Sequence, residues 1–496
     1  MTERKTALKL RNLFSAKDMT VGAPWQRIAE FAVPMLLGNI AQQLYNTVDS
    51  IVVGKYVGDN ALAAVGSSSP ILNLLLALFV GISTGAGIII SQRFGAGDRK
   101  GLSRAIGNCI SLAAIASLII LVVGPLISRP MLELLDTPTS IIDWCADYLN
   151  IFFIGASGFI FYNILSGVLR GMGDSASALV FLIVSTILNI GLDIWFVAGF
   201  GMGVPGVSLA TVLAQGISAV LCYFKLMGMR DVFDLNLEQL KLRKDTALKI
   251  IKIGLPSGIT QAIFSVAMLV VQTLTNSLGE MVIAANVIIM RVDGFAIMPN
   301  MTFGQTMSVY TGQNVGAGKL DRVHKGTKQG LLMAAGLSAA ITVILLFLNK
   351  FLFGFFTDTV ELIHLAGRMM RIMAVGYVAV SVTQVLGGVM RGCGDTTTPH
   401  VDLHDHHHRP AHPGGLRHGL PHRQPRMAQR PSLLPVHLAA GVLDHGRHHH
   451  PDRLSPGQVA PEGPVCRRYS RVKFTGGNRH VCFGSPRIQP AERTGL

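Results

Sequence analysis

Long apolar stretches recur along the chain, and short polar or charged segments separate them. A stretch of about 20 apolar residues can cross a bilayer as one helix, because each residue adds roughly 1.5 Å across about 30 Å of hydrocarbon. The pattern therefore predicts an all-α polytopic membrane protein with about ten transmembrane helices. The predicted spans lie near residues 28–53, 68–90, 106–127, 148–169, 178–199, 206–226, 252–274, 287–310, 329–349 and 370–390.

The predicted helices belong to two copies of one pattern. Short segments recur 221 residues later, as Gly95 and Gly316 illustrate. The repeated pairs are Gly58-Asp59 with Gly279-Glu280, Gln92–Asp98 with Gln313–Lys319, and Arg170–Asp174 with Arg391–Asp395. Several pairs at one displacement indicate an internal duplication of domain length. Six spans in a copy return the chain to its starting side, so the copies should be related by a pseudo-two-fold axis along the membrane normal.

The spans and loops divide the chain into five parts. These are a cytoplasmic N-terminal segment (1–22), an N-terminal six-helix bundle (23–226), a charged cytoplasmic linker with an amphipathic helix (227–249), a C-terminal bundle of four helices (250–399) and a tail (400–496). The fold is thus expected to be two six-helix bundles, of which the second is incomplete. No apolar stretch of membrane length follows its fourth span.

Composition and charge fit a membrane location. Half of the residues are apolar, and only 14% are charged. Much of the net charge of +15 lies in the tail and in loops on one side of the membrane, so we expect no nucleic-acid partner. The basic N-terminal segment, with Arg4, Lys5 and Lys9, should be cytoplasmic by the positive-inside rule. We expect a multi-pass protein of the bacterial cytoplasmic (inner) membrane.

The segment from His400 onward differs in composition from the rest. It holds 14 of the 16 histidines and 12 of the 22 prolines, and no helix of that composition can span lipid. One interpretation is a histidine-rich metal-binding tail, although the histidines lack the spacing of a defined metal site. The other is a shifted reading frame. A histidine or aspartate codon read one base later encodes Ile, Thr or Met when the next codon begins with C or G. Applied between His400 and His412, this shift restores a missing span, so we predict a mostly disordered frameshift product.

Asp49 is an acid inside the first predicted span. It shares one helical face with Gln42 and Asn46, because spacings of three and four residues bring helical side chains together. A carboxylate at that depth costs about 2.5 to 3.5 kcal/mol, so Asp49 should face a water-filled cavity. The alternative is a surface aspartate near the outer interface.

Asn189 and Asp193 form a second polar pair, four residues apart on the fifth predicted span. Two acids on helices of one bundle can share a proton or hold a small cation, because burial and like charge both favour the neutralised form. Thr211 on the sixth span and Tyr148 at the start of the fourth are candidates to complete this network. The alternative is a polar pair that only packs helices together.

The second copy does not repeat this arrangement. Val270 stands where the first copy has Asp49. Asp293 is the acid well inside a span of the second copy; it either pairs with Arg291 near the outer end of its helix or contacts substrate. Gln261 and Gln272 on the seventh span are further candidates for the lining of a cavity.

Motifs of covalent catalysis do not occur in this chain. Gly312 to Lys319 resembles a phosphate-binding loop, but Gln313 occupies a required glycine position and Leu320 replaces the Ser or Thr that should follow the lysine. No Ser/His/Asp set, HExxH motif or cysteine spacing of a metal site is present. We therefore expect neither an enzyme nor a cofactor.

Four features together resemble one transporter family. They are the run Tyr45–Gly54, the loop Gly95-Ala96-Gly97, the loop Arg170–Asp174 and the duplication. With them the chain is similar to multidrug and toxic compound extrusion (MATE) transporters, nearest the DinF-like branch, over roughly residues 23–399. The resemblance implies twelve helices in two bundles around a central cleft and export of organic cations or related amphiphiles against H+ or Na+.

The resemblance also assigns roles to residues. Asp49, Asn189, Asp193 and Thr211 match the acidic network of the family's amino-terminal lobe, which implies that they bind the coupling cation. The missing final pair of helices departs from the family pattern, leaves the C-terminal bundle open and puts transport by this chain in doubt.

We therefore predict a secondary active efflux transporter, a monomer in the lipid bilayer, that exchanges small amphiphilic or cationic substrates for H+ or Na+. One alternative is a lipid-linked saccharide flippase of related architecture, which would need a cavity richer in Arg and Lys. The other is a histidine-rich metal-binding membrane protein.

Overall fold

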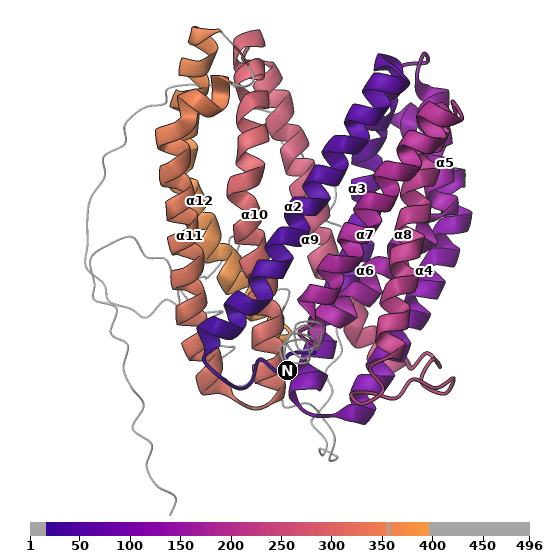
Figure 1. The fold of residues 1–496 in the computed structure, drawn as a ribbon, viewed down its shortest axis with the longest axis vertical. Helices are drawn as coiled ribbons and strands as arrows, with labels where there is room; N and C mark the ends of the chain where they lie inside the picture. The colour runs from indigo at the N-terminus through magenta and orange to yellow at the C-terminus, as the bar shows by residue number, and fades with distance from the viewer. Residues whose placement is uncertain (1–15, 355–356, 358, 396–496) are drawn as a thin grey trace, which may run out of the picture. The chain divides into compact units, whose positions relative to one another are not determined.

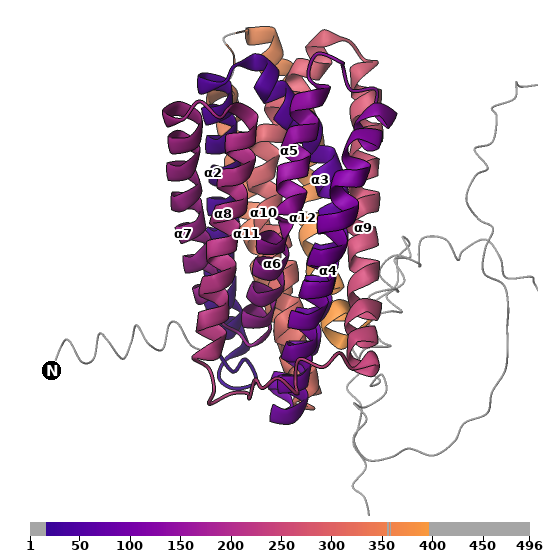
Figure 2. The same ribbon diagram turned by 90° about the vertical axis from the view of Figure 1, so that its right-hand side faces the viewer.

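The computed structural model describes residues 16–354, 357 and 359–395, and this part of the chain is helical with no strand. In hydrocarbon every backbone N–H and C=O must be satisfied within its own segment, which favours helices. The elements are α2 (Pro24–Tyr56), α3 (Asp59–Gly95), α4 (Arg99–Leu134), α5 (Ile142–Ile154), α6 (Ala156–Gly171), α7 (Ser175–Asp193), a π-helical turn η1 (Ile194–Gly199), α8 (Gly203–Met227), α9 (Lys244–Asn276), α10 (Glu280–Gly316), α11 (Leu320–Gly354) and α12 (Val360–Cys393). Figures 1 and 2 show that the long helices run roughly parallel to one another.

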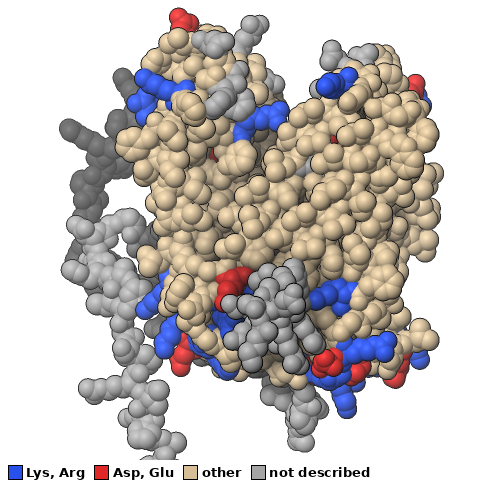
Figure 3. All heavy atoms as spheres, in the orientation of Figure 1, with Lys and Arg blue, Asp and Glu red and all other residues tan. Residues whose placement is uncertain are grey.

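Eight of the ten predicted spans fall within single helices; 148–169 runs over α5 and α6, and 178–199 runs over α7 and η1. The all-α membrane fold is confirmed. Within the described residues, eight helices are long and apolar enough to cross a membrane, or nine if the bent pair α5 and α6 is one span. The helix α2 is not among them, because Asn39, Gln42, Gln43 and Asp49 lower its hydropathy. Figure 3 shows a broad band with few charged side chains between two ends where Lys and Arg gather.

The internal duplication is visible in the backbone. A shift of 221 residues maps the bounds of α3 onto those of α10. The glycines after these helices, Gly97 and Gly318, both adopt positive φ, at 64° and 70°. Only glycine reaches this region without strain, so the two loops share one backbone conformation. The copies differ where α5 and α6 meet at a bend of 52°, because the equivalent α12 is a single helix.

The two halves cross at the end of the molecule that holds the N-terminal segment. A Cβ atom on Gly95 of α3 would collide with the backbone carbonyl of Gln313, and one on Gly316 of α10 would collide with that of Gln92. The side chains of these glutamines also reach across the crossing. Gln92 Nε2 donates to the carbonyl of Gly392 at 2.9 Å, and Gln313 Nε2 donates to that of Gly171 at 3.1 Å. Each contact is the two-fold counterpart of the other, so the crossing lies on the pseudo-symmetry axis.

The N-terminal segment, residues 16–23, ties the first half to the second at the same end. The Met19 N–H donates to Gln313 Oε1 at 2.8 Å. Arg322 of α11 donates to the carbonyl oxygens of Gly22, at 2.8 Å, and of Met19, at 3.1 Å. The backbone N–H and C=O groups of this non-helical segment are thus satisfied by side chains of the second half.

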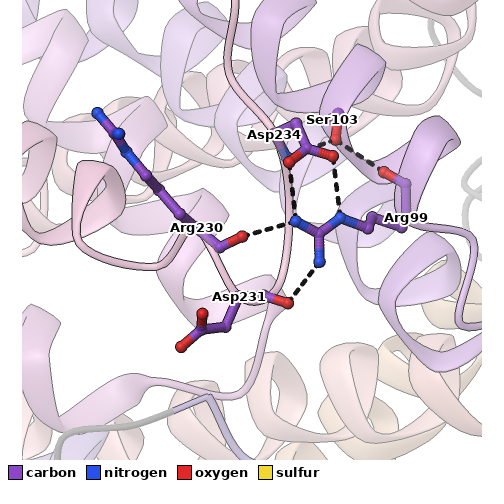
Figure 4. Close-up of polar contacts among 5 residues, drawn as sticks. All are labelled: Arg99, Ser103, Arg230, Asp231 and Asp234. Atoms are coloured by element: carbon purple, nitrogen blue, oxygen red, sulfur yellow. Dashed lines mark hydrogen bonds and ion pairs between the residues drawn. The ribbon is translucent and has the colours of Figure 1, made fainter.

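The linker between the halves is clamped in turn to α4. Figure 4 shows Arg99 donating to both carboxylate oxygens of Asp234, at 2.9 and 2.8 Å. The same guanidinium binds the carbonyl oxygens of Arg230 and Asp231, and Ser103 Oγ accepts from the Asp234 N–H at 2.9 Å. The pKa of Asp234 lies below the ordinary carboxyl value of 3.8, because its carboxylate accepts hydrogen bonds from Arg99.

The amphipathic helix predicted in the linker is wrong. Residues 228–243 form turns and irregular backbone, and α9 begins directly after them. Side chains of α4 form hydrogen bonds with backbone groups of the linker that a helix would use for its own hydrogen bonds. Ser111 Oγ donates to the carbonyl of Leu240, and Asn108 Oδ1 accepts from the Arg243 N–H at 2.8 Å.

The first helix of each copy has a different environment. The helix α2 packs against α7, whereas α9 packs mainly against α3. Asp49 of α2 is only 9% exposed, but its counterpart on α9, Val270, is 65% exposed. The counterparts of α7 and α8 fall in residues 396–496, which lie outside the described residues, as does the predicted disorder of the tail.

Replacing Gly95 by Ala should destabilise the crossing by about 1 to 3 kcal/mol, because the added methyl group meets backbone atoms that have no room to yield. Thermal unfolding of the purified chain in detergent measures the effect. Gly66→Ala on the same helix is the matched control, since a Cβ there has no neighbour within 4 Å. Equal melting temperatures for the two variants would contradict this account of the crossing.

Replacing Arg99 by Ala should release the linker and speed amide hydrogen exchange over residues 228–243. In the unaltered chain the Asp234 carboxylate has a lowered pKa, so its contribution is fully present above the ordinary value of 3.8 and is lost as the pH falls through the lowered one. The difference between variant and parent should therefore shrink in acid to the part due to the carbonyl groups of Arg230 and Asp231, which do not titrate. Arg104→Ala, an exposed arginine of the same helix, serves as control, and an equal effect there would exclude a specific clamp.

Candidate functional site

Two carboxyl groups meet between α2 and α7, which pack side by side. Asp49 of α2 and Asp193 of α7 are hydrogen-bonded to each other through their side chains. Both are buried, and Asp193 is fully so. A carboxylate only accepts hydrogen bonds, so this contact requires a proton on one of the two groups. The structure thus brings together two acids that the sequence placed on separate helices.

Asn189 and Thr211 extend the pair toward α8. Asn189 lies one turn before Asp193 and is fully buried. With its amide oriented to satisfy both ends, its nitrogen donates to Asp193 Oδ2 at 3.0 Å and its oxygen accepts from the Thr211 N–H at 3.3 Å. The four residues predicted to bind a cation therefore form one connected group across α2, α7 and α8.

Each aspartate keeps one oxygen without a partner among the described side chains. Asp49 Oδ1 and Asp193 Oδ1 are buried and accept no hydrogen bond from this part of the protein. A buried polar atom left in this state costs free energy of about 1 to 3 kcal/mol or more. Carboxylate, amide and hydroxyl oxygens are ligands of small hard cations, and a carboxyl pair can also hold a proton, so this group has the chemistry of a site for either.

Two further polar residues continue the group and were missed from the sequence. Ser185 lies two turns before Asp193 on α7, and Gln215 lies one turn after Thr211 on α8; both are buried, and Ser185 Oγ and Gln215 Oε1 lack partners. The spacing of four residues could have identified them, since residues i and i+4 share a helical face. Serine and glutamine side chains are also common where helices only pack together, so their spacing alone did not mark them as functional.

Tyr148 contacts α8, the third helix of this group, through its backbone carbonyl. It is buried on α5, and its carbonyl accepts a hydrogen bond at 2.9 Å from Ser208 of α8, the helix of Thr211. Gln42 is half-buried on α2, and the side chain of Asn46 lies outside the described side chains. Gln42 forms no hydrogen bond with either acid within the described side chains.

The second-half candidates do not gather into a comparable site. Gln261 is exposed and Gln272 half-buried on α9. The carboxyl group of Asp293 on α10 is hydrogen-bonded to the Tyr377 hydroxyl of α12. The ion pair with Arg291 is not formed, because residues two apart on a helix point to different faces. Arg291 instead lines a cavity of about 370 Å³ between α10 and α2.

Comparison with known proteins identifies the class. The MatE family model matches residues 34–195 and 256–401, more than half of the chain. A probable multidrug resistance protein of Bacillus subtilis, YoeA, is 27% identical over 384 residues, which cover 76% of this chain and 83% of the relative. A second probable multidrug resistance protein of the same organism, YpnP, is 29% identical over 379 residues, which cover 76% of this chain and 85% of the relative.

The fold has close counterparts among solved structures. One, titled an outward-facing conformation of a multidrug resistance MATE family transporter of the MOP superfamily, matches with a TM-score of 0.72 and 24% identity, over 78% of this chain and 86% of the other. The chain belongs to the MatE family, whose members are multidrug transporters. It is therefore a multi-pass membrane transporter and not an enzyme.

Proposed function

We propose that this protein exports amphiphilic organic cations across the bacterial cytoplasmic membrane in exchange for H+ or Na+. The observation that carries the proposal is the hydrogen-bonded pair Asp49 and Asp193, each with an unsatisfied buried oxygen. Asn189 and Thr211 complete the site for the coupling cation. The family relationship supports efflux, and the buried acids support coupling, because an acid inside a span is by default a functional group.

The exchange follows from charge. With one coupling cation bound, the acid pair carries a single negative charge, the like-charge repulsion is removed, and α2 and α7 can pack closely. Without it, two like charges repel and the helices separate, which changes the shape of the first half. The substrate binds one of these two states more tightly, so binding of the cation shifts the population and releases the substrate.

Alternating access then needs a movement of one half against the other. The crossing at Gly95 and Gly316 supplies a pivot, since the closest backbone contacts between the halves lie there. The N-terminal segment and the linker lie at the same end and hold it closed. Opening toward that side would have to break the contacts of Arg322 with Gly22 and Met19.

Orientation and assembly are part of the same proposal. The end that carries the N-terminal segment also carries Arg93, Arg99, Lys319 and Arg322, and the positive-inside rule assigns such an end to the cytoplasm. We infer a monomer, because both halves of the transport unit belong to one chain.

We also propose that residues 400–496 result from a shifted reading frame. The family match ends at residue 401, where the composition changes. The exposed face of α9 supports a missing pair of helices equivalent to α7 and α8. Resequencing the DNA that encodes Thr398 to His412 tests this directly. An intact frame would leave the tail as a genuine part of the protein, and a histidine-rich metal-binding function would then have to be considered.

Replacing Asp49 or Asp193 by Asn should reduce gradient-driven efflux by about 10-fold or more, because the coupling free energy between cation and substrate is lost. The measurement is export of a fluorescent organic cation from proteoliposomes under imposed H+ or Na+ gradients, with this chain and with its frame-corrected form. Asp143→Asn, an exposed acid outside the site, is the control. Full efflux in both acid variants at equal protein levels would refute the assignment of the coupling site.

A further inference from the structure

A positively charged side chain lines a cavity between the two halves. Arg291 of α10 and Gln43 of α2 form its polar part, and Val287, Met290 and Phe295 form its apolar part. The volume of about 370 Å³ lies in the range of small-molecule sites. The guanidinium thus reaches a pocket that is otherwise suited to an apolar ring.

The guanidinium of Arg291 has no acidic partner in the described part of the chain. Asp293, the nearest acid along the helix, is hydrogen-bonded to Tyr377 instead. Arg291 lies eleven residues inside α10 and four residues inside the outer limit of the predicted span 287–310. A charged residue there is costly unless it faces a cavity and has a function, and a free guanidinium presents five donors in a fixed planar arrangement.

The cavity is separate from the acid pair. Gln43 and Asp49 are six residues apart on α2, which places them on different sides of the helix. The helix contacts α7 on one side and α10 on the other. The first half therefore presents negative charge toward α7, and the second half presents positive charge toward α2.

We propose that Arg291 and Gln43 bind the anionic group of a zwitterionic amphiphile, with the apolar body of the ligand against Met290 and Phe295. The proposal rests on the proposed export function and specifies its substrate class. A purely cationic substrate would be repelled by the unpaired guanidinium, whereas a carboxylate can accept two parallel hydrogen bonds from it. Substrates that carry both an ammonium and a carboxylate should therefore bind more tightly than cations of the same shape.

Two dyes test this with one change between them. Rhodamine B carries a cationic ring system and a free carboxylate, and its ethyl ester carries the same ring system without the negative charge. Fluorescence anisotropy on the full-length chain in lipid nanodiscs gives both dissociation constants. We expect rhodamine B to bind more tightly than the ester, and Arg291→Gln to weaken rhodamine B by about 10-fold while leaving the ester unchanged or improved.

Two further variants separate binding from folding. Arg291→Lys keeps the charge but loses the two-pronged geometry, so it should restore part of the preference for rhodamine B. Arg129→Gln removes an exposed arginine on α4, far from the cavity in the chain's helix packing, and should leave both constants unchanged. Equal binding of the two dyes by the unaltered chain, or an equal loss for both dyes in Arg291→Gln, would overturn the proposal.

The result is independent of ion coupling. Failure of the proposed function appears as unchanged efflux in the Asp49 and Asp193 variants. Failure of the present inference appears as an absent dye preference in a binding assay that needs no gradient.

Discussion

Close packing of helix backbones at glycines holds the two halves together: α3 meets α10 at Gly95 and meets α9 at Gly81 and Gly85. At Gly95 and Gly316 two helix backbones meet with no side chain between them. In a membrane, association of helices relies on such packing and on hydrogen bonds, because lipid supplies no hydrophobic drive between them. Gln92 and Gln313 add one hydrogen bond each across the axis. The symmetry of these contacts follows from the duplication, since each half supplies the same residues to the other.

The two halves share one arrangement of helices but differ in the residues that face the interior. The first half holds two acids that bind each other, and the second half has Val270 in place of Asp49 and an unpaired arginine on the cavity side of α10. A duplicated scaffold allows this division, because helix positions are set by packing at the crossing while the residues that face the interior are free to differ. In the proposed mechanism, the first half binds the coupling cation and the second half contacts the substrate.

The segments before α2 and before α9 are held in similar ways. The first is hydrogen-bonded to α10 and α11, and the second is hydrogen-bonded to α4. In both, arginine side chains satisfy backbone carbonyl groups. These contacts lie at one end of the helices. They therefore stabilise the packing at that end and leave the opposite end unrestricted.

The sequence alone determined the positions of the helices, the duplication and the pairing of Asn189 with Asp193, because apolar length and a spacing of four residues are local properties of the chain. It also marked Asp49 as an acid that needs a partner. Only the tertiary structure decided that this partner is Asp193, because helix packing brings together residues far apart in sequence. The same holds for Asp293, whose carboxyl group binds Tyr377 and leaves Arg291 free, and for the linker, where side chains of α4 bind the backbone in place of the predicted helix.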